Sequence, residues 1–199
     1  MTLPNKLTLG RIIVVPVMIV IACIPYLNEK NLFMNVSIAN FINFILFILA
    51  SLTDFFDGYL ARKLNQVTTF GKFADPLADK MLVLTSLLIL MLQNPNARFG
   101  DIYLPIVPLW ATAIILIREL MVSGIRLVAA QKGDVIAAGM AGKVKTFVTM
   151  IAICFAFLSG IGNSIAVLSL VLIYLSVVLT IYSGIVYFIN AKEIILESV

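Results

Sequence analysis

The chain has 199 residues, of which 62% are hydrophobic and only 12% are charged, and its mean hydropathy is +1.10. Soluble domains carry roughly half apolar and about a quarter charged residues. The composition therefore excludes an ordinary soluble domain, a disordered chain and a disulfide scaffold. No long stretch alternates apolar and polar residues, which excludes a transmembrane β-barrel. What remains is an integral membrane protein built from helices.

Six stretches are apolar enough to cross a bilayer, which takes about 20 residues. The first eleven residues are too polar to span and are expected to lie at the membrane surface. The connections are short, so residues 1–199 are predicted to form one membrane domain. The predicted fold class is all-α, an integral bundle of six transmembrane helices with a short N-terminal interfacial segment. The predicted spans are residues 10–28, 39–60, 76–93, 104–128, 144–162 and 164–189.

The basic residues are sorted to one side of these spans. With the N-terminus inside, twelve of the fourteen Lys and Arg residues fall on the inner side, and only Lys30 and Arg98 fall on the other. This asymmetry predicts a multi-pass protein of the cell membrane with both termini in the cytoplasm. As an alternative, the first span is a secretory signal with Lys6 and Arg11 as its charged region. More membrane protein would follow such a cleavage, so a spanning helix is favoured.

Four of the ten acidic residues lie between positions 54 and 79. Asp54 and Asp57 are three residues apart at the end of the second span, and Asp75 and Asp79 are four apart at the start of the third. These spacings place each pair on one helix face, and a short connection makes the two helices antiparallel neighbours. Converging carboxylates repel one another unless they are protonated or hold cations. An all-oxygen site without His or Cys favours Mg²⁺, Mn²⁺ or Ca²⁺.

Four aspartates suit two ions that share ligands, an arrangement that supports phosphoryl transfer. Gly58 and Ala61 lie on the face of the first pair and leave a slot beside it, and Arg62 stands at the mouth as a phosphate contact. Pro76 disfavours helix at Asp75, so that the third span either begins at Pro76 with Asp75 as N-cap or is kinked there. In the simpler alternative, the acids only pair with neighbouring basic residues, namely Arg62, Lys63, Lys72 and Lys80.

Residues 57–79 read D-G-x2-A-R-x8-G-x3-D-x3-D. This pattern resembles the signature of the CDP-alcohol phosphatidyltransferases, and Asp54 matches its further upstream aspartate. The resemblance implies a membrane enzyme in which four aspartates hold two divalent cations, Mg²⁺ or Mn²⁺. It also implies that Asp79 is the catalytic base for the incoming alcohol. The residues that it assigns to the metals are Asp54, Asp57, Asp75 and Asp79, and those that it assigns to the CDP-linked lipid include Gly58, Ala61, Arg62 and Gly71.

Two further stretches bear on the acceptor alcohol. Residues 3–11 and the block 117–146 resemble bacterial members of the family that use sn-glycerol 3-phosphate. Asn5 and Thr8 match the first stretch and are assigned to the CDP-diacylglycerol side of the site. An acceptor with its own phosphate needs cations, and the region 118–145 supplies a predicted basic pocket. Its members are Arg118 and Arg126, eight apart on one helix face, with Lys143 and Lys145 at the start of the fifth span.

Other interpretations of these residues stay open. The lysines would also fit ordinary positive-inside flanking, and Arg118 would also fit an ion pair with Glu119 or with an aspartate of the cluster. The acceptor could instead be serine, inositol, inositol phosphate or phosphatidylglycerol, the last giving cardiolipin. A divalent-cation transporter is the alternative of a different class, although transporters place ligands on several spans near the midplane. Members of the family are commonly homodimers, so the resemblance implies that this chain also forms a homodimer. The partners expected are the lipid bilayer and the two substrates, with no nucleic acid.

Overall fold

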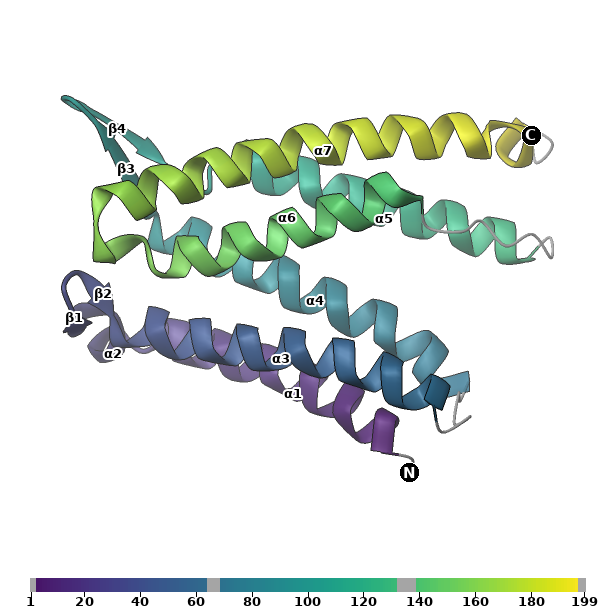
Figure 1. The fold of residues 1–199 in the computed structure, drawn as a ribbon, viewed down its shortest axis with the longest axis horizontal. Coiled ribbons are helices and arrows are strands. Elements are labelled where there is room, and N and C mark those ends of the chain that lie inside the picture. Colours follow the sequence, from purple (N-terminus) through teal and green to yellow (C-terminus); the bar gives the residue numbers. More distant parts are fainter. Residues whose placement is uncertain (1–2, 64–68, 132–138, 197–199) are drawn as a thin grey trace.

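The computed structural model describes residues 3–63, 69–131 and 139–196, and nearly all of this chain is helical (Figure 1). Two short antiparallel hairpins and a single 3₁₀ turn join some of the helices. The elements in chain order are α1 (Leu3–Cys23), α2 (Pro25–Glu29), β1 (Asn31–Phe33), β2 (Val36–Ser37), α3 (Ile38–Lys63), α4 (Thr69–Gln93), β3 (Asn96–Phe99), β4 (Ile102–Pro105), α5 (Leu109–Gln131), α6 (Met140–Phe157), η1 (Ser159–Ile161) and α7 (Asn163–Leu196).

The long helices form two groups joined by α4. Helix α1 packs against α3 and α4, whereas α7 packs against both α5 and α6. Helix α4 contacts members of both groups, since it also touches α5 and α6. Both chain termini lie at one end of this bundle, and the hairpins lie at the other (Figure 1). The second half of α3, the first half of α4 and the second half of α5 therefore all lie at the end that carries the termini (Figure 1).

Small residues line the packed interior. Their short side chains allow close approach of helix backbones, the usual solution where apolar helices meet in a membrane. The rings of Phe47 on α3 and Phe157 on α6 lie 6.5 Å apart and fill part of the remaining space. Many large apolar side chains point outward instead, as lipid-facing positions require; Leu92 is 80% exposed and Leu109 is 68% exposed. The buried alanines of this core include Ala50, Ala111, Ala152, Ala156 and Ala166.

Three of the described helices are long and apolar enough to cross a membrane by length and composition. They cover Asn5–Cys23, Met140–Phe157 and Asn163–Lys192. Helices α3, α4 and α5 are also long, and they carry the four predicted aspartates and the arginines of the predicted basic pocket. The prediction of a helical membrane protein is confirmed at this level.

The N-terminus differs from the sequence-based expectation of a separate surface segment. Helix α1 begins at Leu3 and continues without interruption to Cys23. Its polar residues Asn5, Thr8 and Arg11 are only 9%, 1% and 1% exposed. Their side chains are covered by protein because α1 packs on α3 and α4, which carry the acidic residues. The polar side chains of these first turns therefore face the interior of the bundle.

The segment before α5 is a hairpin, whereas the fourth span was expected to begin at residue 104. Strands β3 and β4 pair antiparallel, and Phe99 lies opposite Ile102. The turn between them requires Gly100, whose φ of +60° is in the left-handed region that glycine adopts freely. Pro105 and Pro108 then keep the chain out of helical geometry until Leu109.

Pro76 lies inside α4, which runs through it from Thr69 to Gln93. Asp75 is therefore not the N-cap of the third span, and that span does not begin at Pro76. Membrane helices tolerate an internal proline because neighbouring groups satisfy the freed carbonyl. Asp75 and Asp79 remain one helical turn apart, as the site requires.

Candidate active site

The predicted acidic cluster is divided between α3 and α4, which contact one another. Asp54 and Asp57 belong to α3, and Asp75 and Asp79 belong to α4. The side chains of residues 54–73 lie outside the described part of the structure. The roles assigned to Asp54 and Asp57 therefore stay predictions, as do those of Gly58, Ala61, Arg62 and Gly71.

Asp75 and Asp79 are half-buried and lie one turn apart on α4. The hydroxyl of Thr8 on α1 donates a hydrogen bond to Oδ1 of Asp75 at 2.6 Å. Thr8 is 1% exposed, so water does not compete for this contact. The contact fixes the Asp75 carboxylate and ties the first helix to the acidic cluster. Thr8, predicted on the CDP-lipid side, thus lies directly against a predicted metal ligand.

The carboxylates of Asp75 and Asp79 are oxygen donors of the kind that a hard divalent cation takes, and in the described part of the chain no third Asp, Glu, His or Cys joins them. Two carboxylates one turn apart offer oxygen ligands from one helix, and α3 brings the other aspartate-bearing segment alongside. Oxygen-only ligation is what Mg²⁺ and Mn²⁺ favour. The hydrogen bond from Thr8 orients the Asp75 carboxylate, and hydrogen bonds of this kind commonly orient the carboxylates of metal sites.

A second cluster is built around the carboxylate of Glu119 on α5. The ammonium group of Lys145 on α6 donates to Glu119 Oε1 at 2.5 Å, and Arg118 Nη1 donates to the same oxygen at 3.0 Å. Arg118 also donates through Nη2 to the hydroxyl of Ser183 on α7 at 2.8 Å. Lys145 is only 2% exposed, and a buried cation is costly unless an anion accompanies it. Glu119 therefore links α5 to α6, and its neighbour Arg118 links α5 to α7.

Lys80 connects this cluster to α4. It follows Asp79 in the sequence, and its ammonium group donates to the hydroxyl of Ser123 on α5. Ser123 in turn donates to the backbone carbonyl of Glu119 at 2.6 Å. Lys80 interacts electrostatically with both Asp79 and Glu119. The acidic and basic clusters are thus parts of one network.

A small cavity of about 20 Å³ lies where the two clusters meet. Asp79, Glu119 and Lys145 line it together with Lys80, Thr146 and Thr149. Its size accommodates a group about as large as a water molecule, such as a hydroxyl. The predicted base and one of the predicted phosphate-binding lysines therefore line the same small cavity. Among the residues that line the cavity, two cations, Lys80 and Lys145, face two carboxylates, Asp79 and Glu119.

The structure brings together only part of the predicted basic pocket. Arg126 is exposed, and its Nε donates to the Tyr187 hydroxyl at 3.2 Å while the guanidinium lies 5.5 Å from that ring. Arg118 and Arg126 both contact α7, as their spacing of eight predicts. Lys143 is exposed and lies two residues from buried Lys145, hence on a different face of α6. Arg118 and Lys145 form the buried pair, whereas Lys143 lies apart from them.

The sequence-based assignment of site residues did not include Glu119, Ser123 and Ser183. Glu119 entered only as an alternative partner for Arg118, and that ion pair is present in the structure. A signal existed in the sequence, because adjacent opposite charges inside an apolar span seldom occur without a role. Nothing in the sequence indicated that Lys145, on another helix, would share the same carboxylate oxygen.

The comparison with known proteins defines the class. Residues 1–182 match the family model described as CDP-alcohol phosphatidyltransferase. The match covers far more than half of the chain, and the chain belongs to this family.

Similar proteins come from several bacteria. A Bacillus subtilis protein named CDP-diacylglycerol--glycerol-3-phosphate 3-phosphatidyltransferase is 43% identical over 76% of this chain and 74% of its own length. A Rickettsia felis protein of the same name is 38% identical over 96% of both chains. A Mycobacterium tuberculosis protein named probable phosphatidylglycerophosphate synthase is 36% identical over 93% of this chain and 79% of its own. The bacterial relatives and the apolar helices indicate a bacterial membrane protein.

Proposed function

We propose that the chain transfers the phosphatidyl group of CDP-diacylglycerol to sn-glycerol 3-phosphate, giving phosphatidylglycerol phosphate and CMP. This is the activity for which phosphatidylglycerophosphate synthases are named, and it belongs to phospholipid biosynthesis. The observation that carries the proposal is the cavity where Asp79 and Lys145 meet. It combines a carboxylate that can accept a proton with a buried cation that can attract a phosphorylated acceptor. The names of the relatives support the same substrates.

In this reaction, Asp79 accepts the proton of the acceptor hydroxyl as that oxygen attacks the phosphorus of the phosphatidyl group. A new bond forms between the acceptor oxygen and this phosphorus, and the bond from phosphorus to the CMP oxygen breaks. Arg118 and Lys145 bind the phosphate that the acceptor already carries. Glu119 holds both cations in place, as its contacts of 3.0 and 2.5 Å indicate. Glu119 is therefore a positioning residue.

The four aspartates Asp54, Asp57, Asp75 and Asp79 would hold two divalent cations, Mg²⁺ or Mn²⁺. When bound, these ions supply positive charge that stabilises the pyrophosphate of the CDP-lipid as it breaks. Thr8 keeps the Asp75 carboxylate in one orientation. Asn5 lies one turn before Thr8 on α1 and is 9% exposed. We assign it to the part of the site that binds the CDP-linked lipid.

The proposed topology has six spanning helices, both termini in the cytoplasm and the active site facing the cytoplasm. Two observations support it. Both chain ends lie at the same end of the bundle (Figure 1), as an even number of crossings requires. The Lys and Arg residues gather on that side in the sequence, and cytoplasmic loops carry such an excess.

We place an acyl chain of the lipid substrate in an apolar groove between α5 and α7. The groove has a volume of about 490 Å³ and is lined by apolar side chains such as Ile117, Ile181 and Phe188. Arg118 belongs to the same lining. This arrangement brings a lipid tail next to the network that binds the polar groups.

The alternatives are less well supported. In a divalent-cation transporter, ligands would come from several spans near the midplane. The predicted acidic ligands here come from α3 and α4 at one end of the bundle. Acceptors without a phosphate, such as serine or inositol, would give Arg118 and Lys145 no phosphate to bind. Inositol phosphate and phosphatidylglycerol remain alternative acceptors, and an assay with a panel of acceptors distinguishes them from sn-glycerol 3-phosphate. We also propose that the chain forms a homodimer, because members of the family commonly do.

CMP release measures the reaction directly. We expect the purified chain, with CDP-diacylglycerol and Mg²⁺ or Mn²⁺, to release CMP when sn-glycerol 3-phosphate is added. CMP release should stop when a chelator removes the metal ions. A panel of serine, inositol, inositol phosphate and phosphatidylglycerol tests the other acceptors. No release with any acceptor would contradict the enzyme proposal. Release with another acceptor but not with sn-glycerol 3-phosphate would contradict only the substrate.

The acceptor role of Arg118 predicts a selective kinetic effect. Arg118→Ala is expected to raise the KM for sn-glycerol 3-phosphate by more than about tenfold, the effect of losing one charge-assisted contact worth roughly 1.5–3 kcal/mol. The KM for CDP-diacylglycerol should change much less. Ser183→Ala is the matched control, since it removes a hydrogen bond to Arg118 but keeps the positive charge. An equal rise in both KM values would remove Arg118 from the acceptor site.

A further inference from the structure

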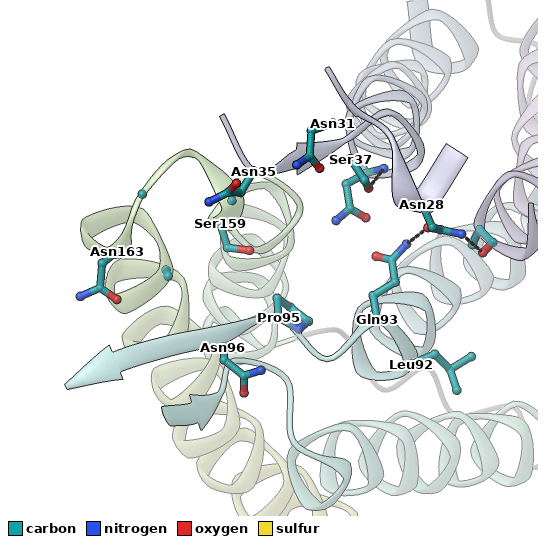
Figure 2. Close-up of a pocket in the computed structure, with 15 residues that line it drawn as sticks. Asn28, Asn31, Asn35, Ser37, Leu92, Gln93, Pro95, Asn96, Ser159 and Asn163 are labelled. Atoms are coloured by element: carbon teal, nitrogen blue, oxygen red, sulfur yellow. Dashed lines mark hydrogen bonds between the residues drawn. The ribbon is translucent and has the colours of Figure 1, made fainter. Parts of the chain in front are cut away.

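The end of the bundle opposite Asp75 and Asp79 contains a pocket of about 690 Å³ (Figure 2). Its walls come from the end of α1, α2, the β1–β2 hairpin, the start of α3, the end of α4, the start of β3, η1 and the start of α7. This volume lies within the range of small-molecule sites in proteins, roughly 300–1,000 Å³. Nothing in the phosphatidyl transfer proposed above uses this pocket.

The chemistry of the lining is unusual for a chain so rich in apolar residues. Of the eleven asparagines in the sequence, six line this one pocket. Gln93 adds a seventh carboxamide, and Ser37 and Ser159 add hydroxyl groups. A carboxamide offers two hydrogen-bond donors and one acceptor oxygen without carrying a charge. The asparagines are Asn28, Asn31, Asn35, Asn40, Asn96 and Asn163.

Hydrogen bonds between elements hold the walls in place. Gln93 at the end of α4 donates to Asn28 at 3.1 Å (Figure 2). Asn163 at the start of α7 exchanges two hydrogen bonds with the backbone of Arg98, each of 2.8 Å. The backbone of Asn35 donates to the carbonyl of Gly160 at 3.2 Å. These contacts make the pocket a preformed feature of the fold.

The crossing at Gly160 leaves no room for a side chain. A Cβ at this position would lie 2.2 Å from the carbonyl oxygen of Asn35. The β1–β2 turn can therefore rest directly on the connection between α6 and α7, which closes one side of the pocket. Figure 2 shows Asn35 and Ser159 on this side, whereas Gln93 and Asn28 stand on another.

The nearby charged groups are not part of the lining. None of the fifteen residues drawn around the pocket, all of them in the described part of the chain, carries a charge. Lys30 donates to the hydroxyl of Tyr26 at 2.5 Å, and the Arg98 guanidinium donates to the carbonyl of Gly100 at 2.8 Å. A phosphate or a carboxylate would need such cations, and a metal ion or an amine would need carboxylates. The lining therefore selects against charged ligands.

Two side-chain oxygens in the pocket lining lack a hydrogen-bond donor. Oδ1 of Asn40 and Oε1 of Gln93 are buried and have no hydrogen-bond partner in the protein. A buried acceptor without a donor costs roughly 1–3 kcal/mol. Hydroxyl groups that enter the pocket could donate to such oxygens after small side-chain rotations. They could accept from the carboxamide nitrogens of the lining other than those of Asn28, Gln93, Asn96 and Asn163, which already donate within the protein.

We propose that this carboxamide pocket binds a neutral, hydroxyl-rich group, the chemistry of a sugar or a polyol. Such a ligand has a donor and an acceptor at every hydroxyl, which matches a wall of carboxamides and serines. Two sources offer this chemistry: the headgroup of an uncharged glycolipid and a free sugar in solution. The position of the pocket among the hairpins, at one end of a membrane bundle, is accessible to both.

Hydrogen exchange of the full chain in lipid nanodiscs tests the proposal. One sample contains phosphatidylcholine alone, a second adds monogalactosyldiacylglycerol, and a third adds free maltose. At a ligand concentration about four times its Kd, backbone amides of residues 31–37 and 94–98 should exchange about fivefold more slowly. Protection in the second sample alone identifies a lipid headgroup, and saturable protection in the third identifies a free sugar. No protection in either sample overturns the proposal.

Variants link the protection to the lining. Asn31 and Asn96 are exposed, so the double variant Asn31→Leu/Asn96→Leu removes two carboxamides at little cost to folding. It should lose the protection, whereas Asn31→Gln/Asn96→Gln should retain it. Asn190→Leu, an exposed asparagine near the other end of α7, is the matched control. Equal protection in the parent chain and the leucine variant would overturn the proposal, as would equal protection by anionic phosphatidylglycerol.

Discussion

Replacing Asp79 with asparagine is expected to lower the rate of CMP release by at least about 100-fold, the contribution of a positioned general base. The amide has nearly the size of the carboxylate but cannot accept the proton of the acceptor hydroxyl. The cavity that Asp79 shares with Lys145 and Glu119 would keep its shape. Binding of the CDP-lipid, measured separately with a labelled nucleotide, should persist in the variant.

Asp101→Asn is the matched control for this change. Asp101 is an exposed aspartate in the β3–β4 turn, at the end of the bundle opposite Asp79. Its replacement should leave CMP release within about twofold of the parent chain, as for surface substitutions away from a site. If Asp79→Asn loses CDP-lipid binding to the same extent as turnover, Asp79 acts chiefly as a metal ligand. If turnover persists, another group is the base.

Replacing Glu119 with glutamine is expected to have the largest effect on stability. The carboxylate of Glu119 accompanies Lys145, which is 2% exposed, and Arg118, whose side chain is 14% exposed. Breaking a buried ion pair from one side leaves an uncompensated charge and costs roughly 3–5 kcal/mol of the free energy of unfolding. A clear decrease in the thermal unfolding midpoint of the purified protein should therefore be seen in detergent.

A double-mutant cycle separates this effect from the loss of a hydrogen bond. Glu119→Gln combined with Lys145→Met removes both charges of the 2.5 Å pair, so the combined loss should be smaller than the sum of the single losses. Glu29→Gln, the same change at an exposed position of α2, should leave the midpoint unchanged. Simple additivity of the two single effects would contradict the role given to Glu119.

Much of the fold followed from local pattern. A bilayer accepts few polar groups, so long apolar stretches predict helices with little ambiguity. The six predicted spans correspond to α1, α3, α4, α5, α6 and α7 within several residues at most ends. The burial of the N-terminal turns could not be predicted, because polarity along one segment does not reveal which neighbour will cover it. The β3–β4 hairpin was missed because its residues, such as Ile102 and Leu104, are as apolar as those of a span.

The acidic part of the site could be predicted from the sequence more fully than the basic part. The aspartates stand at fixed spacings within a short segment, so sequence alone brought Asp75 and Asp79 to one face of one helix. The basic half depends on residues far apart in the chain. Lys145 is 26 residues from Glu119 and meets it because α6 packs beside α5's partners, α4 and α7. Lys143, two residues earlier, points elsewhere because a helix turns about 100° per residue.

The sequence by itself determined that the chain is a helical membrane protein and that Asp75 and Asp79 share one face of a helix. These features depend on composition and on spacing within single segments, and the bilayer makes both strongly constraining. Only the tertiary structure decided that Thr8 contacts Asp75, that one carboxylate of Glu119 serves both Arg118 and Lys145, and that six asparagines from separate elements line one pocket. Such groupings arise from how the helices pack against one another, and no pattern within a single segment specifies that packing.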